Sequence, residues 1–327
     1  MATLFLDSNI LLDFFRFGDD DISEVRKIVS LVQGKEITLY INNQLRNEIE
    51  RNREKVLADS FTAVKSIKYS VRAPNYCASF PELAALKDAL KVAGEKHSSL
   101  ITSIENKIRN KELQADKVIE LLFAGAENIE ISTDVIAKAR LRLDLGNPPG
   151  KKGSLGDAVH WESLLSLQSS YFFDLVSRDG DFASEFDSSK IKNFLALEWK
   201  AKFGKFSLIT LFPSLGAYLR ARFPKIKLSD EAEKNELIGR LELSPNFTTT
   251  HTIISEISAF DFFTITQVNR LFEILVSNSQ VGWIATDIDV FDFYNKIKTK
   301  AYLLPDVIQD EAAKLLDVKA DDYFVPF

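Results

Sequence analysis

Residues 4–12 of the chain read Leu-Phe-Leu-Asp-Ser-Asn-Ile-Leu-Leu, and this stretch decides the fold class. An apolar run ends abruptly at Asp7, and a helical apolar pattern begins just after Asn9. The pattern predicts a buried strand over residues 4–6 that delivers an aspartate to its C-terminal tip. Ligands of open α/β sheets bind at the carboxyl ends of the strands, so an acid at this place indicates a metal site or an acid–base site.

The alternation of strand and helix continues along the chain. A second apolar strand is predicted at residues 37–41, and a long helix follows over about residues 43–70. Strand, helix, strand, helix is the start of a parallel sheet. Later apolar runs predict strands at residues 172–177 and 194–197, with a further strand at 208–211. The chain is therefore predicted to have an α/β fold with a central parallel sheet.

A helical insertion is predicted within this sheet, at about residues 75–150. Apolar residues recur at three- and four-residue steps from Leu86 to Ile108, which favours a helical hairpin or arm, with an ordinary core-facing helix as the alternative. From about residue 223, short helices dominate the pattern. We therefore expect an α/β domain over residues 1–222 and a small, mainly helical domain over residues 223–327.

Composition narrows the class of protein and of metal site. No run approaches the roughly 20 apolar residues that a membrane helix needs, and the N-terminus lacks the pattern of a signal peptide. The single cysteine, Cys77, excludes an internal disulfide framework and a cysteine-cluster zinc site. We therefore expect a cytoplasmic protein without membrane contacts. A hard cation held by carboxylates remains open.

The net charge of −6 is unevenly distributed. Residues 223–327 contain 10 Lys/Arg and 17 Asp/Glu, whereas residues 1–222 contain 31 and 30. The first part is neutral although it contains every candidate catalytic acid, so its remaining surface must be correspondingly basic. This asymmetry is compatible with phosphate contacts in the N-terminal part.

Four acids share a position at the start of a helix or at the end of a strand: Asp7, Glu48, Asp157 and Asp179. Right-handed crossovers in a parallel sheet bring such positions to the same edge. Four neighbouring carboxylates repel one another strongly, and such a cluster usually survives only with cations. Oxygen ligands of this kind suit Mg²⁺ or Mn²⁺.

Each acid also has a structural alternative. Asp7 is a suitable helix N-cap, and Asp157 fits a capping box that begins at Ser154. Asp179 is followed by glycine and suits a turn. Glu48 can pair with a polar neighbour on its own helix. The order and the spacing of the four acids together favour the metal site.

The four motifs resemble those of the PIN-domain nucleases. Those proteins begin with a strand that ends in Asp-x-Asn, here residues 7–9, and carry a glutamate in the helix after the second strand, here Glu48. A later strand ends in Ser/Thr-x-Asp-x-Asp-Phe, here residues 177–182. The motif Gly-Asp-x-x-x-Trp at residues 156–161 is most similar to the larger bacterial PIN-like proteins. The resemblance covers roughly residues 1–200.

This resemblance implies a three-layer α/β/α fold and a site for one or two Mg²⁺ or Mn²⁺ ions. Asp7 is then the central ligand, and Glu48, Asp157 and Asp179 bind the ions directly or through water. Asp181 either replaces Asp179 as a ligand or caps the following helix. Asn9 and Ser177 orient ligands or phosphate without binding the metal.

Basic residues near these acids are candidates for holding the phosphodiester backbone. The set consists of Arg51, Arg142, Lys151, Lys152 and Arg178.

The resemblance implies hydrolysis of phosphodiester bonds by an endoribonuclease, with toxins and phage-defence effectors as common settings of such domains. A structure-specific DNA nuclease and a non-catalytic scaffold for nucleic acid or protein are the alternatives. The acidic C-terminal part argues against direct RNA binding there. We expect it to bind a protein inhibitor or regulator, or to form a homo-oligomer.

Overall fold

The computed structural model describes residues 2–16, 19–150, 154–169 and 171–324. In this part of the chain, five parallel strands form one sheet in the order β3-β2-β1-β4-β5. The strands are β1 (Ala2–Leu6), β2 (Ile37–Asn42), β3 (Glu127–Ile129), β4 (Phe172–Val176) and β5 (Leu208–Phe212). The predicted central parallel sheet is confirmed.

Strand β1 lies at the centre of the sheet. Its residue Leu4 is opposite Leu39 of β2 and Asp174 of β4. Residues 4–6 are almost completely buried, which is expected for a parallel strand with both faces covered. The predicted strand over residues 4–6 is therefore present, and its tip leads directly to Asp7.

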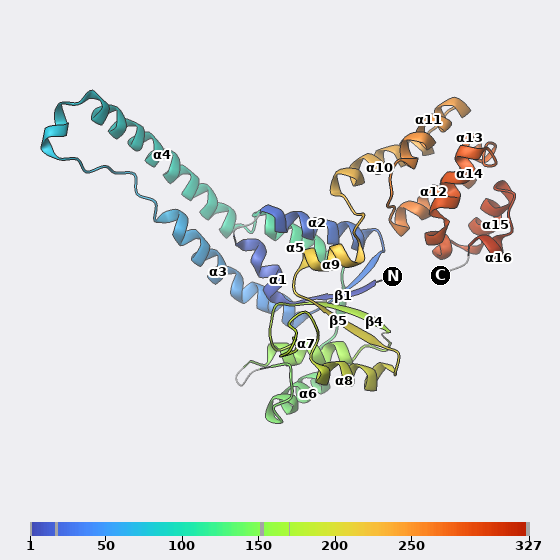
Figure 1. Cartoon of the computed structure of the whole chain (residues 1–327), viewed down its shortest axis with the longest axis horizontal. Coiled ribbons are helices and arrows are strands. Elements are labelled where there is room, and N and C mark those ends of the chain that lie inside the picture. Colours follow the sequence, from blue (N-terminus) through green and yellow to red (C-terminus); the bar gives the residue numbers. More distant parts are fainter. Residues whose placement is uncertain (1, 17–18, 151–153, 170, 325–327) are drawn as a thin grey trace.

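Helices cover both faces of this sheet. Helices α2, α5 and α9 lie on one face, and α6, α7 and α8 lie on the other (Figure 1). The elements of this part are α1 (Ser8–Leu12), the 3₁₀ helix η1 (Asp13–Phe15), α2 (Asp19–Gln33), α3 (Asn43–Lys65), α5 (Gln114–Ala124), α6 (Thr133–Asp144), α7 (Gly156–Leu165), α8 (Asn193–Phe203) and α9 (Leu215–Arg222). The three-layer α/β/α arrangement agrees with the prediction.

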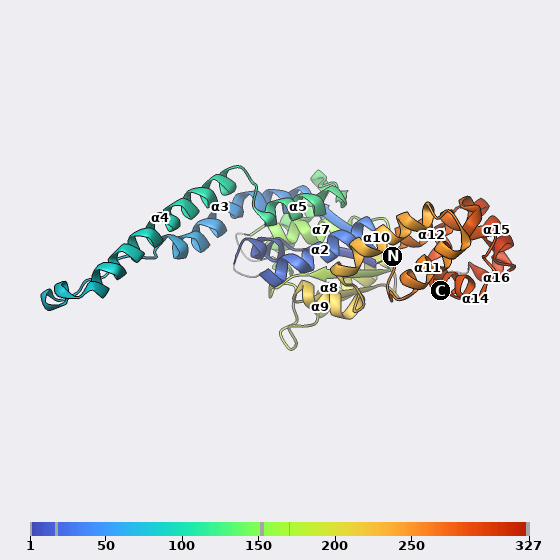
Figure 2. The same ribbon diagram turned by 90° about the horizontal axis from the view of Figure 1, so that it is seen from above.

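A long helical arm projects from this body (Figures 1 and 2). It consists of the end of α3, the 3₁₀ helix η2 (Asn75–Ser79) and α4 (Pro81–Arg109), and we define the arm as residues 61–111. Helix α4, which is described over its full length, contains no buried residue. The apolar stripe predicted for this segment thus forms an arm instead of a core-facing helix.

The structure corrects two sequence-based expectations for the body. Residues 194–197, predicted as a strand, belong to helix α8, because Leu195 and Trp199 are one helical turn apart and both are fully buried. The segment predicted as a helical insertion, residues 75–150, also contains the edge strand β3 and helices α5 and α6, which belong to the layers of the body. The projecting part is therefore shorter than expected.

The C-terminal part is a bundle of helices with its own apolar core (Figure 1). Its elements are α10 (Leu228–Glu242), α11 (Phe247–Ser258), α12 (Ile265–Ser277), α13 (Ser279–Gly282), α14 (Ile288–Ile297), the 3₁₀ helix η3 (Lys298–Leu303), α15 (Asp306–Leu315) and α16 (Ala320–Tyr323). Thr264 and Gln267 form a capping box at the start of α12, as their spacing suggests. The core of the body extends to Ile226, so a boundary after residue 222 stays a prediction.

A buried glutamate joins the bundle to the body. Glu36, which precedes β2, accepts hydrogen bonds from the backbone N–H of Ile265 (2.8 Å) and from Nζ of Lys300 (2.7 Å). Lys300 also donates to the carbonyl of Phe263 and lies over the ring of Phe262, 4.1 Å from its centroid. The bundle is thus attached at the end of the sheet where β2 begins, opposite the strand tips.

Among the described residues, no helix has the length and apolar character needed to cross a bilayer.

Candidate metal centre

Asp7 lies at the tip of β1 and is almost fully buried. Its Oδ2 accepts hydrogen bonds from Nδ2 of Asn9 (2.7 Å) and from Oγ of Ser177 (2.5 Å). Within the described residues, the Asp7 side chain makes no capping hydrogen bond to helix α1. Burial raises the pKa of Asp7, although His160 and the Ser177 hydroxyl oppose the rise. Asn9 and Ser177 therefore hold the carboxylate in place, and the N-cap alternative does not apply to its side chain.

Glu48 lies in the second turn of α3, whose first turn is capped by the side chain of Asn42. Its Oε1 accepts a hydrogen bond from Nε2 of Gln44 (2.7 Å), and its Oε2 is 3.1 Å from Nε2 of His160. Burial acts to raise the pKa of Glu48, but the contacts with His160 and Gln44 outweigh it and lower the pKa. Glu48 is therefore an ionised carboxylate that points toward the strand tips.

Asp157 lies in the first turn of α7 and is partly buried. Its pKa is raised to about 7, mainly by burial and then by the negative charges of Asp7, Asp179 and Glu48. One of its oxygens lies within 4.8 Å of an oxygen of Asp179, and the charges of Asp7 and Glu48 also act on it. The four predicted acids thus gather at one edge of the sheet, and we call them the carboxylate site.

Asp179 and Asp181 follow strand β4 in a short turn. The N–H of Asp179 donates to Oγ of Ser177 (3.0 Å), and the N–H of Asp181 donates to Oδ1 of Asp179 (2.9 Å). Asp179 is therefore both a turn residue and a member of the acidic group. One ligand atom each from Asp157, Asp179 and Asp181 lie within 4.8 Å of one another, so Asp181 is close enough to share a cation with the other two.

A second group of ligand atoms meets beside the first. Asp7, Glu48 and His160 each offer one ligand atom, and these atoms also lie within 4.8 Å of one another. The oxygen-rich donors of the two groups match the preference of hard divalent cations. A cation would also relieve the repulsion that raises the pKa of Asp157. The residues present therefore fit a divalent metal ion.

His160 belongs to this site but was not among the predicted ligands. It is 1% exposed and contacts Glu48 through Nε2, and its ring lies 5.3 Å from the ring of Phe5. It follows Asp157 by three positions, so both side chains lie on one face of α7. That spacing is the sequence signal that points to it.

A glycine makes room for Glu48. A Cβ atom on Gly156 would lie 2.1 Å from Oε1 of Glu48. Such a contact is far inside van der Waals distance, so any side chain at this position would displace the carboxylate. The glycine of the Gly-Asp pair before the helix thus allows α7 and α3 to approach closely.

Comparison with protein-family models is consistent with this geometry. The model of the family described as PIN domain matches residues 4–182, which is more than half of the chain. The chain is a PIN-domain protein. The match includes residues 4–6 of β1, all of β2 to β4, and the four acids of the carboxylate site. A search of the curated proteins finds no match, and neither does a search of the solved structures.

PIN domains are generally metal-dependent nucleases that bind nucleic acid, and the acidic edge of this PIN domain offers the corresponding ligands. Two of the predicted substrate-binding residues have described side chains on its surface. Arg51 is exposed on α3, three positions after Glu48. Arg178 is exposed beside Asp179, pairs with Asp13 and donates to the carbonyl of Asn9. Lys151 and Lys152 lie outside the described residues.

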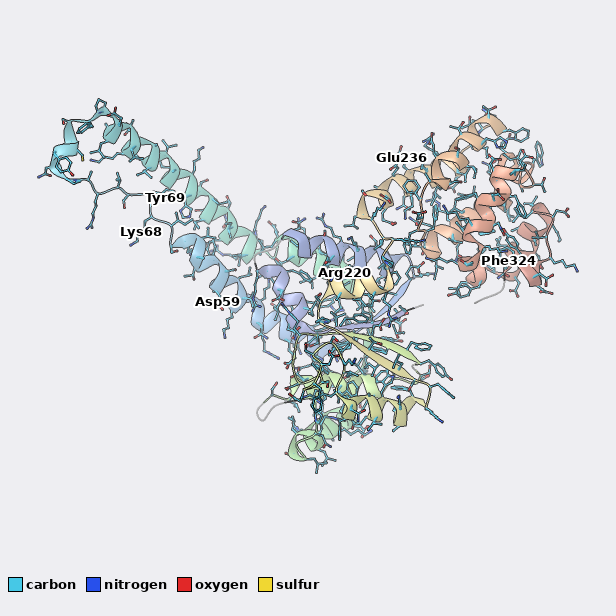
Figure 3. The ribbon with its side chains drawn as sticks, viewed as in Figure 1. Asp59, Lys68, Tyr69, Arg220, Glu236 and Phe324 are labelled. Atoms are coloured by element: carbon cyan, nitrogen blue, oxygen red, sulfur yellow. The ribbon has the colours of Figure 1, made fainter. Side chains whose placement is uncertain are left out.

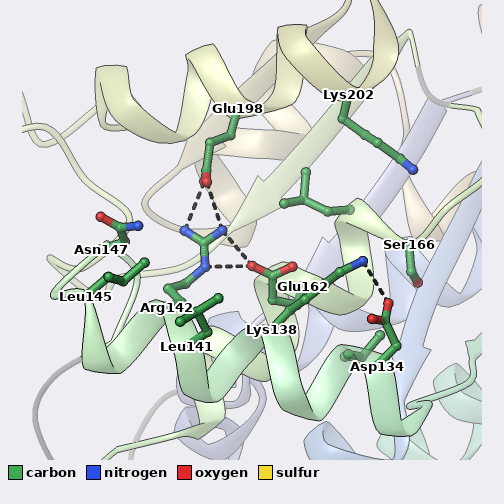
Figure 4. A pocket seen from close by; sticks show the side chains of 12 residues that line it. Asp134, Lys138, Leu141, Arg142, Leu145, Asn147, Glu162, Ser166, Glu198 and Lys202 are labelled. Atoms are coloured by element: carbon green, nitrogen blue, oxygen red, sulfur yellow. Dashed lines mark hydrogen bonds and ion pairs between the residues drawn. The ribbon is translucent and has the colours of Figure 1, made fainter.

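Arg142 does not have the predicted role, because its guanidinium is engaged inside the PIN domain (Figure 4). It is buried, and it donates to Glu162 (2.6 and 2.8 Å) and to Glu198 (2.9 Å twice). It also donates to the carbonyl of Pro148, in the loop that leads to α7. We call Arg142, Glu162 and Glu198 the arginine hub.

The arginine hub forms part of the wall of a cavity of about 520 Å³ between α6, α7 and α8. It ties these three helices together through one cation. Trp161 adds to it, because its Nε1 donates to Glu198 (3.0 Å). The hub therefore supports the helix that carries Asp157, and Arg142 has no free donor face for phosphate.

Proposed function

We propose that this PIN-domain protein is a metal-dependent endoribonuclease. The observation that carries the proposal is the convergence of Asp7, Glu48, Asp157 and Asp179 from four different elements on one edge of the sheet. Acids from such separate places in the sequence gather at a cost in repulsion, which a bound cation offsets. The resemblance to PIN-domain nucleases favours RNA as the substrate.

The carboxylate site would hold one or two Mg²⁺ or Mn²⁺ ions, with Asp7 as the central ligand. Asp181 and His160 are close enough to complete the set. Bound divalent ions lower the pKa of a water molecule and stabilise charge on the phosphodiester oxygens. Asn9 and Ser177 keep the carboxylate of Asp7 in one orientation through their hydrogen bonds.

The basic side chains around the site would position the substrate. Arg51 lies about one turn beyond Glu48 on α3, so a phosphate near the carboxylate site is within reach of its long side chain. Arg178 lies next to Asp179 at the tip of β4. Positive charge at these two places offsets the repulsion between a phosphodiester backbone and the acids.

A cleavage assay tests the proposal. Purified protein is incubated with labelled RNA and labelled DNA in the presence of Mg²⁺, Mn²⁺ or EDTA. We expect metal-dependent cleavage of RNA, a loss of about 100-fold or more in Asp7→Asn and Asp157→Asn, and full activity in the matched control Asp292→Asn, an exposed aspartate of the bundle. Cleavage that survives EDTA or both substitutions would contradict the metal-dependent mechanism.

The same assay separates the alternatives. Cleavage of DNA alone would favour a structure-specific DNA nuclease. Metal binding without cleavage of either substrate, measured by calorimetry, would favour a non-catalytic scaffold.

A toxin or phage-defence effector is the cellular setting that we propose for this activity. Induced expression of the wild type should then arrest bacterial growth, whereas Asp157→Asn should not. Normal growth with soluble, active wild-type protein would contradict this setting.

A further inference from the structure

The helical bundle has an exposed apolar patch on its surface. The patch consists of Leu243, Phe247, Trp283 and Ile288, and we call it the Trp283 patch. Trp283 is 72% exposed and Ile288 is 82% exposed. The rings of Phe247 and Trp283 are 6.2 Å apart and pack edge to face. Contiguous exposed apolar residues, with tryptophan above all, are typical of protein–protein interfaces.

Polar contacts hold the parts of this patch together. His251, one turn after Phe247, contacts Asp289 through Nδ1 (2.7 Å) and Asp287 through Nε2 (3.3 Å), on either side of Ile288. Nδ2 of Asn278, at the start of α13, donates to the carbonyl of Ser244 beside Leu243 (3.2 Å). The Trp283 patch is therefore a defined surface with acidic residues at its edge.

The tip of the arm has a second exposed apolar surface. It consists of Tyr76, Phe80 and Leu86, and we call it the arm tip. Tyr76 is 75% exposed and Phe80 is 56% exposed. Residues 72–87 contain two positive residues, Arg72 and Lys87, and one acid, Glu82. The arm tip therefore combines apolar side chains with positive charge.

The two parts of the chain that carry these surfaces have opposite net charges. The arm, residues 61–111, contains nine Lys/Arg and four Asp/Glu, a net charge of +5, whereas residues 223–327 have a net charge of −7. Pairing two arms or two bundles would bring together parts with like net charge. Pairing one with the other joins apolar groups and opposite charges.

The two surfaces cannot meet within one molecule, because they lie at opposite ends of it (Figures 1 and 2). Figure 3 shows Lys68 and Tyr69 on the arm, far from Glu236 and Phe324 in the bundle. The body of the PIN domain lies between them. A partner that carries the complementary surface is therefore needed, and a second copy of this chain carries it.

We propose that the arm tip of one copy docks on the Trp283 patch of a second copy. The contact is heterologous, since different surfaces of the two copies meet, so a bound pair still has one free arm tip and one free Trp283 patch. Such contacts produce closed rings or open chains of molecules. The association is favoured at high protein concentration and weakened by salt, because part of it is electrostatic.

Sedimentation velocity of the full chain over a wide range of protein concentration tests this proposal. We expect oligomers that grow with concentration and dissociate at high salt. Two surface variants should each remain monomeric at concentrations where the wild type associates: Trp283→Ser, and Tyr76→Ser combined with Phe80→Ser. Both change exposed residues, so circular dichroism and thermal unfolding should match the wild type.

Mixing the two variants is the decisive step. The Trp283→Ser protein keeps an intact arm tip, and the Tyr76→Ser, Phe80→Ser protein keeps an intact Trp283 patch. One productive contact remains in the mixture, so we expect a 1:1 heterodimer that grows no further. A contact of like surfaces would give a different result, because one variant alone would still dimerise.

Charge reversal gives a second, independent test. Asp287→Lys with Asp289→Lys should abolish self-association. Mixed with a protein that carries Arg72→Glu and Lys87→Glu, this variant should regain both contacts, so we expect growth beyond the 1:1 dimer that one wild-type contact alone would give. Cys77, the only cysteine of the sequence, is partly exposed beside Tyr76. A photoreactive maleimide on Cys77 should therefore cross-link to residues 243–292 of another copy.

Three results would overturn the proposal. They are a wild type that stays monomeric at every concentration, association that persists in both variants, and cross-links from Cys77 that fall on the arm of the other copy.

Discussion

Helix α7 carries members of two acidic groups that differ in how their charge is neutralised. Glu162, near its end, belongs to the arginine hub, where Arg142 binds two carboxylates. The pKa of Asp157, in the first turn, is raised to about 7 by burial and then by the charges of three other carboxylates. One group takes its cation from the chain itself, and for the other we propose a cation from solution. Five positions of sequence thus separate a structural acid from a candidate ligand.

The largest expected effect comes from removing the internal cation. Arg142→Met keeps an apolar stem but leaves Glu162 and Glu198 buried without their partner, so the free energy of unfolding should fall by about 3–5 kcal/mol. Urea unfolding followed by circular dichroism measures the change. The double variant Arg142→Met, Glu162→Gln is the control and should recover part of the loss. An unchanged midpoint in the single variant would refute neutralisation by Arg142.

At the carboxylate site, removing a negative charge should raise the free energy of unfolding, whereas Arg142→Met should lower it. The folded pKa of Asp157 is raised from 3.8 to about 7, so this group lowers the free energy of unfolding progressively as the pH rises from 3.8 to about 7, and the loss is complete above that range. In metal-free protein near pH 8, Asp157→Asn should therefore raise the free energy of unfolding by about 2–4 kcal/mol, since a tenfold change in proton affinity is about 1.4 kcal/mol.

The gain in Asp157→Asn should shrink near pH 5, where wild-type Asp157 is protonated. Glu162→Gln is the matched control on the same helix and should be destabilising at both pH values. A loss of stability in Asp157→Asn near pH 8 would contradict the proposed repulsion.

A bound divalent cation should stabilise the wild type, as the asparagine is expected to stabilise the Asp157→Asn variant. Mg²⁺ at about 100 times its dissociation constant should stabilise the protein by about 2.7 kcal/mol. The same concentration of Mg²⁺ should stabilise the protein more near pH 8 than near pH 5, because protons compete for Asp157 below pH 7 and weaken Mg²⁺ binding. Thermal unfolding with and without Mg²⁺ measures it, with NaCl of equal ionic strength as the control. An equal effect at both pH values would argue against Asp157 as a ligand.

The smallest effect concerns the fit between α7 and α3. Gly156→Ala should push the carboxylate of Glu48 aside and lower the affinity for Mn²⁺ by about tenfold, with little change in stability. Calorimetric titration with Mn²⁺ measures the affinity. Gly239→Ala in α10, where the nearest atom to a new Cβ is 4.0 Å away, is the matched control and should bind Mn²⁺ normally. Equal affinities in the two variants would show that Glu48 tolerates the displacement.

The sequence predicts the strand tips well because their signal is local. An apolar run that stops at Asp7 or just before Ser177 shows both the strand and its end, and the structure has β1 and β4 at these places. Parallel order then brings the tips to one edge. The places of Asp7 and Asp179 follow from that order, whereas those of Glu48 and Asp157 also depend on how α3 and α7 pack against each other.

Short apolar runs are ambiguous, which explains the error at residues 194–197. Phe-Leu-Ala-Leu fits a buried strand as well as one turn of a buried helix. The packing of Leu195 and Trp199 one turn apart decides for the helix. That packing depends on distant residues, which the local pattern does not contain.

The sequence also does not show which residues a charged side chain will pair with. Arg142 lies 20 positions before Glu162 and 56 before Glu198, so nothing nearby shows that two carboxylates will surround it. A solvent-exposed arginine near a candidate active site has the same appearance in a sequence. His160 is a milder case, since its place one turn after Asp157 gives a partial signal.

Helix α3 joins the carboxylate site to the arm. It bears Glu48 in its second turn and runs without a break over 23 residues, Asn43–Lys65, into the arm. The start of this helix therefore carries a candidate metal ligand, and its other end extends into solvent. A partner that binds the arm and favours one orientation of α3 would change the affinity of the carboxylate site for its cation. The cation would then change the affinity of the arm for that partner by the same factor.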